Sequence, residues 1–190
     1  MKRLGKEDGA VYEEAVRLMK RAQEVRKNAY TPYSHFAVGA AILGTDENVY
    51  TGCNVENAAY SPGNCAERTA VFKAVSEGCK SFEAIAIVGA KEGEVPGGRN
   101  EEELEVPGGR NDEELEAPGG RNEEELEVSG SKKGDSTAPG VICSPCGVCR
   151  QVLREFCEEK DFRVYLTDGS QLFCYTLEEL LPLSFGPNNL

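Results

Sequence analysis

Two short cysteine motifs, far apart in the chain, constrain the fold more than any other feature of the sequence. In the first, Cys65 lies two positions before Glu67, and the second is the pair Cys146 and Cys149 with two residues between them. If each motif begins a helix, the helix dipole and the free backbone N–H groups lower the pKa of these thiols. A fold that brings the two helix starts together therefore creates a pocket of three thiolates.

Both motifs carry residues that are typical of a helix N-terminus. Asn64 is a good N-cap, and Glu67 follows it at the spacing of a capping box. Ser144 is likewise a good N-cap, and Pro145 suits the first helical position because its missing N–H costs nothing there. The sequence therefore predicts that helices begin at these two places.

Three cysteine ligands would hold zinc with a fourth position open, which is the arrangement of a catalytic site. Two simpler interpretations exist: Glu67 could serve only as a capping residue, and a Cys-x-x-Cys pair could be redox-active or half of a structural zinc site. Cys-Ala-Glu at residues 65–67, followed by Pro-Cys-x-x-Cys at 145–149, together match the known signature of zinc-dependent deaminases.

The composition favours a reducing cytosol and argues against nucleic acid as a partner. The 190 residues carry a net charge of −12, which argues against a protein that grips phosphate backbones. No apolar run is long enough for a membrane span, and the charged N-terminus lacks the apolar core of a signal peptide. Five cysteines lie outside the two motifs and do not pair evenly into disulfides, and several of them lie in patterns that indicate small buried hydrophobic residues: Cys53, Cys79, Cys143, Cys157 and Cys174.

Hydrophobic periodicity predicts an α/β domain in which helices cover both faces of a sheet. The predicted helices span 10–28, 65–77, 145–158 and 177–181, and the predicted strands span 36–43, 49–55, 82–88, 163–167 and 171–175. This order predicts a three-layer α/β/α fold with a mixed five-stranded sheet.

An acidic repeat interrupts this plan. Residues 94–126 contain three copies of an eleven-residue unit built on Pro-Gly-Gly-Arg-Asn, and each copy has four acids and one arginine. At −3 per copy, the repeats account for −9 of the net −12. Each unit offers too little apolar surface to bury against a neighbour, so we expect a disordered insert at 91–139 within one domain formed by 1–90 and 140–190. Recruitment of a partner by the acidic array is the alternative.

The chain resembles the small, homotetrameric cytidine deaminases that have a three-cysteine zinc site. The resemblance covers nearly everything except the first ten or so residues and the insert, which is a departure from the family. It is carried by YTPYSHF (30–36), VGAA (38–41), GCNVENA (52–58), CAERTA (65–70), SPCGVCRQ (144–151), ELLP (179–182) and SFGP (184–187).

The resemblance implies one zinc ion per subunit on Cys65, Cys146 and Cys149, with Glu67 as the proton shuttle. It implies a homotetramer in which neighbouring subunits complete each pocket. The implied substrate-binding residues are Asn54 and Glu56 on the ribose, Phe36 against the base, the backbone of Ala66 and Ser144 on the pyrimidine edge, and Ala58, Tyr60 and Phe185 at positions that cross between subunits. Arg68 and Gln151 are further candidates, which could stabilise the thiolates by hydrogen-bonding the sulfur atoms.

The predicted reaction is zinc-dependent hydrolytic deamination of cytidine and 2'-deoxycytidine to the uridines with release of ammonia, in pyrimidine salvage. A carboxylate at Glu56 beside the sugar would repel a phosphate, so free nucleosides are expected rather than nucleotides or polynucleotides. The only histidine, His35, is interpreted as structural. Two alternatives remain open: another small aminopyrimidine nucleoside as the substrate, or an interaction protein whose deaminase core is only a scaffold.

Overall fold

A computed structural model of the chain describes residues 1–92, 94 and 142–190. The predicted insert at 91–139 therefore lies almost entirely outside the described residues. So do its three repeats, apart from Glu94. The proposed division of the chain into a domain and an insert stays a prediction.

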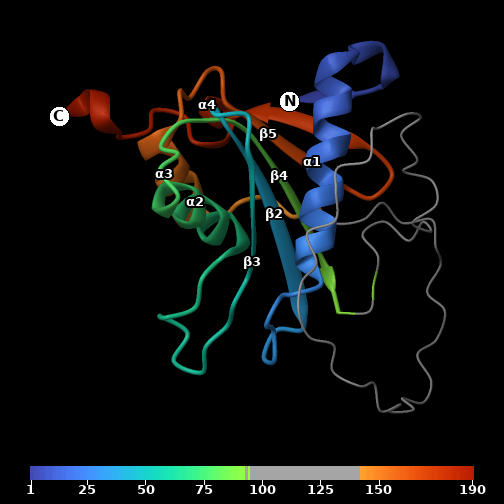
Figure 1. Ribbon diagram of the computed structural model, residues 1–190, viewed down its shortest axis with the longest axis vertical. Coiled ribbons are helices and arrows are strands. Elements are labelled where there is room, and N and C mark those ends of the chain that lie inside the picture. The colour runs from blue at the N-terminus through green and yellow to red at the C-terminus, as the bar shows by residue number, and fades with distance from the viewer. Residues whose placement is uncertain (93, 95–141) are drawn as a thin grey trace.

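A six-stranded mixed sheet forms the middle layer of the fold (Figure 1). Its order is β1-β6-β5-β4-β2-β3, and only the β4–β5 pair is parallel. The predicted count of five is wrong by one, because the short, charged β1 shows no hydrophobic alternation and forms only by pairing with β6. The strands are β1 (Lys2–Leu4), β2 (Phe36–Gly44), β3 (Val49–Cys53), β4 (Phe82–Lys91), β5 (Arg163–Thr167) and β6 (Leu172–Thr176).

Helices cover both faces of this sheet, which confirms the three-layer prediction. In Figure 1, α1 crosses one face, and α2 and α3 lie together over the other. Thr176 caps α4 as predicted, with Glu179 completing a capping box. The helices are α1 (Ala10–Arg26), α2 (Ala66–Ser76), α3 (Gly147–Phe156) and α4 (Leu177–Leu180), and the 3-10 turns are η1 (Lys6–Asp8) and η3 (Pro187–Asn189).

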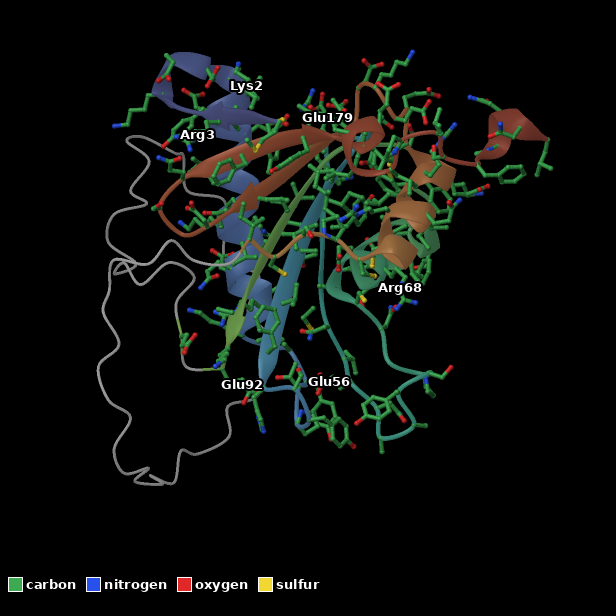
Figure 2. The ribbon with its side chains drawn as sticks, turned by 180° about the vertical axis from the view of Figure 1, so that it is seen from behind. Lys2, Arg3, Glu56, Arg68, Glu92 and Glu179 are labelled. Carbon is green, nitrogen blue, oxygen red and sulfur yellow. The ribbon has the colours of Figure 1, made fainter. Side chains whose placement is uncertain are left out.

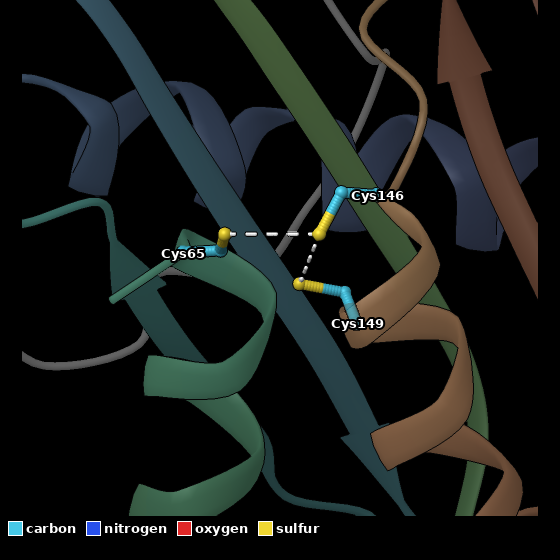
Figure 3. Close-up of side chains that lie close together, drawn as sticks. All are labelled: Cys65, Cys146 and Cys149. Carbon is cyan, nitrogen blue, oxygen red and sulfur yellow. Dashed lines mark hydrogen bonds between the residues drawn. The ribbon is translucent and has the colours of Figure 1, made fainter. Parts of the chain in front are cut away.

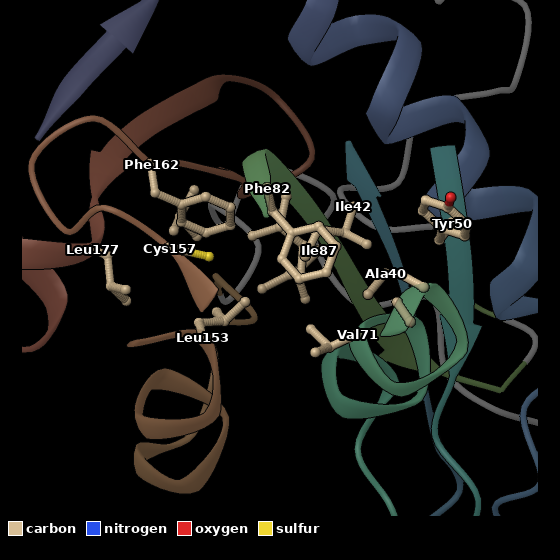
Figure 4. Packing of buried hydrophobic residues seen from close by; sticks show 14 of the residues in the cluster. Ala40, Ile42, Tyr50, Val71, Phe82, Ile87, Leu153, Cys157, Phe162 and Leu177 are labelled. Carbon is tan, nitrogen blue, oxygen red and sulfur yellow. The ribbon is translucent and has the colours of Figure 1, made fainter. Parts of the chain in front are cut away.

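Alternation along the central strands divides the core into two clusters. Successive side chains of a strand point to opposite faces. Ala40 and Ile42 of β2 therefore pack with α2 and α3 in the larger cluster, which Figure 4 shows. Ala41 and Leu43 pack against α1 in the second cluster. Both faces of the central strands are buried, so the helices on each side have fixed positions.

Two glycines let helices approach the sheet closely. A Cβ atom on Gly39 of β2 would lie 2.0 Å from the carbonyl oxygen of Ala22 in α1. A Cβ atom on Gly52 of β3 would lie 2.4 Å from the backbone nitrogen of Ala70 in α2. Neither space admits a larger residue without backbone movement. The contact at Gly52 sets the depth at which α2, and the motif at its start, lies over β3.

Candidate metal centre and active site

Three sulfur atoms meet where the N-termini of α2 and α3 approach each other (Figure 3). Cys65 Sγ lies 4.0 Å from Cys146 Sγ, and Cys146 Sγ lies 3.5 Å from Cys149 Sγ. All three sulfur atoms lie within 4.8 Å of one another. The structure thus brings together two motifs that are 81 positions apart in the chain.

The cysteines themselves begin the helices, which corrects the predicted caps. Cys65 is the N-cap of α2 and Cys146 is the N-cap of α3, and both have extended backbone conformations. Asn64 instead donates a hydrogen bond from its side-chain amide to Thr69 Oγ1 (3.1 Å), and Ser144 lies two residues before the N-cap Cys146. Neither sulfur makes a capping hydrogen bond, so the thiols at the caps point into the cluster and stay available as ligands.

The spacing of the sulfur atoms fits a tetrahedral zinc ion. Zn–S bonds of about 2.3 Å at tetrahedral angles place neighbouring sulfur atoms about 3.8 Å apart. The measured separations of 4.0 and 3.5 Å lie on either side of that value. Three thiol ligands leave one corner of the tetrahedron for another group, as in catalytic zinc sites.

Hydrogen bonding within the cluster separates the thiols into a stronger and a weaker acid. The hydrogen bond with Cys149, and then the Arg68 guanidinium, lower the pKa of Cys65 to about 5. The same contact with Cys65, together with burial and the nearby Glu67, raises the pKa of Cys149. Before any metal binds, the cluster is therefore already prepared to hold a thiolate at Cys65.

Glu67 is buried beside the cluster. It is the second residue of α2 and is only 5% exposed. Burial raises the pKa of its carboxyl group, and the charge of Cys65 raises it further. An interaction with the Cys149 thiol acts in the opposite direction and lowers this pKa. A carboxyl group in this position can hold a proton nearer to neutral pH than an exposed glutamate can.

Arg68 and Gln151, the two candidates for contacts with sulfur, differ in what they reach. Arg68 Nη2 donates to Cys65 Sγ at 3.6 Å, and interactions with Cys65, and then with Cys149, raise the pKa of its guanidinium. Gln151 is not directed at sulfur: its Nε2 donates to the carbonyl oxygen of Phe185 at 2.9 Å. The Gln151 side chain is exposed and contacts the C-terminal segment. The spacing of residues within the motif could not reveal this contact.

Asn54 and Glu56, the residues predicted to bind the ribose, support the backbone before and within β2. The Asn54 side chain accepts from the Val38 N–H (2.8 Å) and donates to the Phe36 carbonyl (2.9 Å). Glu56 Oε2 accepts from two successive N–H groups at the loop before β2. A hydrogen bond from the side chain of Ser34 is the largest factor that lowers the pKa of Glu56. Its carboxylate retains lone pairs for a further donor.

The remaining predicted substrate-binding residues differ in exposure. Ala66 is fully buried as the first residue of α2. Phe36, the first residue of β2, is partly exposed. Tyr60 is 80% exposed and Phe185 is 61% exposed. Ala58 and Ser144 are also exposed. His35 directly precedes β2 and is not one of the residues of the sulfur cluster.

Two arginines are buried, which the sequence patterns did not predict. Arg26 donates to the carbonyl oxygens of Ala37 and Lys91, and Arg154 pairs with Glu159. The signal for Arg26 was present, because it continues the buried stripe of α1 four positions after Ala22. A charged residue on an apolar helix face needs hydrogen-bond partners, so the position of Arg26 in the sequence could have identified it as a buried, hydrogen-bonded residue.

Comparison with known sequences places the chain among deaminases. The family model "Cytidine and deoxycytidylate deaminase zinc-binding region" matches residues 12–102. A cytidine deaminase from Sporosarcina psychrophila is 37% identical over 92% of this chain and 93% of its own length. One from Halalkalibacterium halodurans is 36% identical over 91% of this chain and 95% of its own length.

Comparison with solved structures agrees. The crystal structure of a cytidine deaminase from Burkholderia pseudomallei superposes with a TM-score of 0.59 at 32% identity, and covers 89% of this chain and 97% of its own. A cytidine deaminase from Mycobacterium tuberculosis gives a TM-score of 0.56 at 29% identity, over 90% and 95% of the two chains.

Proposed function

This chain belongs to the cytidine deaminase family and is a hydrolase that deaminates cytidine, and we propose that it uses zinc and also accepts 2'-deoxycytidine. The observation that carries the proposal is the three-sulfur cluster at two helix N-termini with the buried Glu67 beside it. In the cell, this reaction would return pyrimidine nucleosides to the uridine pool, which is a salvage role.

Cys65, Cys146 and Cys149 are the residues that would hold the metal. Bound there, zinc lowers the pKa of a water molecule towards about 7 and so supplies the nucleophile. Three thiolates weaken this effect by bringing negative charge to the site. The N-termini of α2 and α3 offset that charge, and so does Arg68, which donates to Cys65 Sγ.

Glu67 would move the protons of the reaction. As the water attacks C4 of the cytosine ring, the carboxylate takes the water proton and places it on N3. It would then move the remaining proton of that oxygen to the amino group, so that the C4–N bond breaks, C4=O forms and ammonia leaves. Burial suits this task, because the raised pKa of Glu67 lets the group both take and give a proton near neutral pH.

Free nucleosides are the proposed substrates. Asn54 and Glu56 would contact the ribose hydroxyls, and the lowered pKa of Glu56 keeps its carboxylate ionised. An ionised carboxylate accepts hydrogen bonds from hydroxyl groups and repels phosphate. Phe36 would contact the base. The backbone groups of Ala66 and Ser144 would recognise its pyrimidine edge.

We also propose a homotetramer. Tyr60 and Phe185 leave large aromatic surfaces exposed on the single chain, and Tyr33 lies beside Tyr60 with ring centroids 6.3 Å apart. Exposed aromatic residues suit an interface with another copy. Ala58, Tyr60 and Phe185 would then complete a neighbouring pocket.

A reducing compartment such as the cytoplasm is the proposed location. All eight cysteines lie in the described part of the chain and are free thiols. Disulfides persist in oxidising environments and are rare in the cytosol. Among the described residues, no helix combines the length and the apolar character needed to cross a membrane.

Metal analysis combined with an ammonia-release assay tests the proposal. We expect one zinc per subunit, with release of ammonia from cytidine and from 2'-deoxycytidine. We expect little turnover of CMP or of single-stranded DNA. A pure, active protein without zinc would refute the metal assignment, and turnover of CMP that rivals that of cytidine would refute the substrate class.

A further inference from the structure

We infer that Glu92 and Arg26 are positioning residues for the nucleoside pocket. They hold the segment 31–35, which leads directly into Phe36, and so determine where the Phe36 ring stands. The inference rests on the proposed contact of Phe36 with the base. Neither residue lies in the motifs that identify the site.

Glu92, which directly follows β4, binds both ends of this segment. The hydroxyl group of Thr31 donates to its carboxylate. At the other end, Glu92 Oε2 lies 3.5 Å from His35 Nδ1, and the backbone N–H of Glu92 donates to the His35 carbonyl at 2.9 Å. One residue thus fixes the first and the last position of the segment.

Glu56 binds the middle of the same segment. Its Oε2 accepts from the N–H groups of Tyr33 (3.0 Å) and Ser34 (3.2 Å). Figure 2 shows Glu56 and Glu92 at the same end of the molecule. Between these contacts, His35 has a φ of +53°, a left-handed conformation that persists in a non-glycine residue only where its surroundings impose it.

Arg26 joins the two strands on which these contacts depend. Its side chain is buried, and its Nε donates to the Ala37 carbonyl at 3.0 Å. Its Nη2 donates to the carbonyl groups of Lys91 and Glu94, each at 2.9 Å. The guanidinium therefore ties the end of β4 to β2 at the residue after Phe36. Glu92 cannot shift without a change in these bonds.

These contacts act on the position of Phe36 and not on the reacting atoms. Their loss should weaken nucleoside binding while the sulfur cluster and Glu67 keep their geometry. KM should therefore rise, and kcat should change little. In the sequence, Lys91 and Glu92 also lie just before the first acidic repeat, which begins at Glu94.

Glu92→Ala tests the inference, with Glu83→Ala as a matched control. Both glutamates belong to or adjoin β4, at opposite ends, and their side chains are 51% and 50% exposed. For Glu92→Ala we expect KM for cytidine to rise about fivefold with kcat within about twofold, the size of roughly one lost hydrogen bond. Glu83→Ala should match the wild type. Glu92→Gln, which keeps an acceptor for Thr31, should lie between.

A double-mutant cycle with Thr31→Val tests whether Glu92 acts through its hydrogen bond with Thr31. If Thr31 and Glu92 act through one hydrogen bond, the double variant should have a KM close to that of the worse single variant. Fully additive effects, an unchanged KM, or a fall in kcat and melting temperature at unchanged KM would each overturn the inference. A wild-type protein that releases no ammonia from cytidine would instead overturn the proposed function.

Discussion

Cys65 and Glu67 lie two positions apart at the start of α2, yet the pKa values of their side chains are shifted in opposite directions. Hydrogen bonds from Cys149 and Arg68 lower the pKa of the Cys65 thiol, whereas burial raises the pKa of the Glu67 carboxyl group. The thiol is thus prepared to be a ligand and the carboxyl group to carry a proton. One turn of helix supplies both environments because only one of the two side chains is deeply buried.

Replacement of Glu67 by glutamine should remove catalysis and leave the metal in place. The amide keeps the shape of the side chain but cannot take a proton, so we expect kcat to fall about 10²- to 10⁴-fold. Zinc content by metal analysis should equal that of the wild type. A variant that retains most of its ammonia release would contradict the role of Glu67 as the proton shuttle.

Cys146→Ser should have the reverse signature. The variant loses one of the three sulfur ligands, and metal binding is coupled to the stability of the fold. We expect lower zinc content and a lower melting temperature, both measured on the purified protein. Addition of a chelator should lower the melting temperature of the wild type towards that of the variant. Unchanged zinc content would mean that Cys146 is not a ligand.

At the scale of elements, α2 reaches the cluster because it lies directly on β3. The space above Gly52 is closed by backbone atoms of α2, among them the carbonyl oxygen of Ala66 at 2.6 Å from where a Cβ would be. Ala66 lies between Cys65 and Glu67. The contact that holds α2 against β3 therefore also positions Cys65 and Glu67.

Gly52→Ala should displace the start of α2. Backbone atoms cannot turn aside as a flexible side chain can, so we expect a loss of stability of about 1–3 kcal/mol, with weaker zinc binding. Chemical denaturation and metal titration measure the two effects. Gly147→Ala is the control, because nothing lies within 4 Å of its added Cβ. Equal stability of both variants would contradict the close contact.

The helix α3 holds the C-terminal segment through two side chains one turn apart. Gln151 donates to the carbonyl group of Phe185, and Arg154 donates to Ser184 Oγ at 2.9 Å. Arg154 Nε also lies 3.0 Å from Glu159 Oε2. The helix that carries Cys149 thus also fixes Phe185, the aromatic residue that we propose to reach a neighbouring subunit.

Arg154→Met should release this segment. The variant leaves Glu159 without its cationic partner, and we expect a loss of stability of about 2 kcal/mol in chemical denaturation. If Phe185 crosses between subunits, light scattering should also show weaker assembly. Arg17→Met, at an exposed position of α1, should change neither property. A variant as stable as Arg17→Met would mean that Arg154 does not hold the segment.

At the scale of the whole molecule, the acidic repeats stand between the two halves of one fold. The strand β4 before them and the helix α3 after them contribute side chains to the same hydrophobic core cluster. The cost of closing a loop rises by only about 0.6 kcal/mol for each doubling of its length. The domain can therefore carry a long insert without losing its stability.

Deletion of the insert should leave an active enzyme if β4 and Glu92 are kept. With 95–139 replaced by a short Gly-Ser linker, we expect wild-type zinc content and cytidine turnover. Deletion of 91–139 also removes Lys91 and Glu92, which contact Arg26, Thr31 and His35, so its KM should be higher. Ammonia release by both proteins measures the difference. Loss of zinc from the shorter deletion would show that the repeats support the site.

Most of the helices and strands could be predicted from local sequence patterns. Hydrophobic periodicity and turn residues, which act over a few positions, predict the helix α1 and the hairpins β2–β3 and β5–β6. The caps at Asn64 and Ser144 were wrong because the backbone at Cys65 and Cys146 is set by the meeting of two helices. The strand β1 was missed because its order comes from its partner β6.

By itself, the sequence determined the chemistry of the ligands, because the residue types and their spacing are local properties of the chain. Only the tertiary structure decided that the sulfur atoms of α2 and α3 meet, that Gln151 faces Phe185 rather than sulfur, and that Glu92 binds Thr31 and His35. These contacts join residues far apart along the chain, and packing against a shared sheet brings them together.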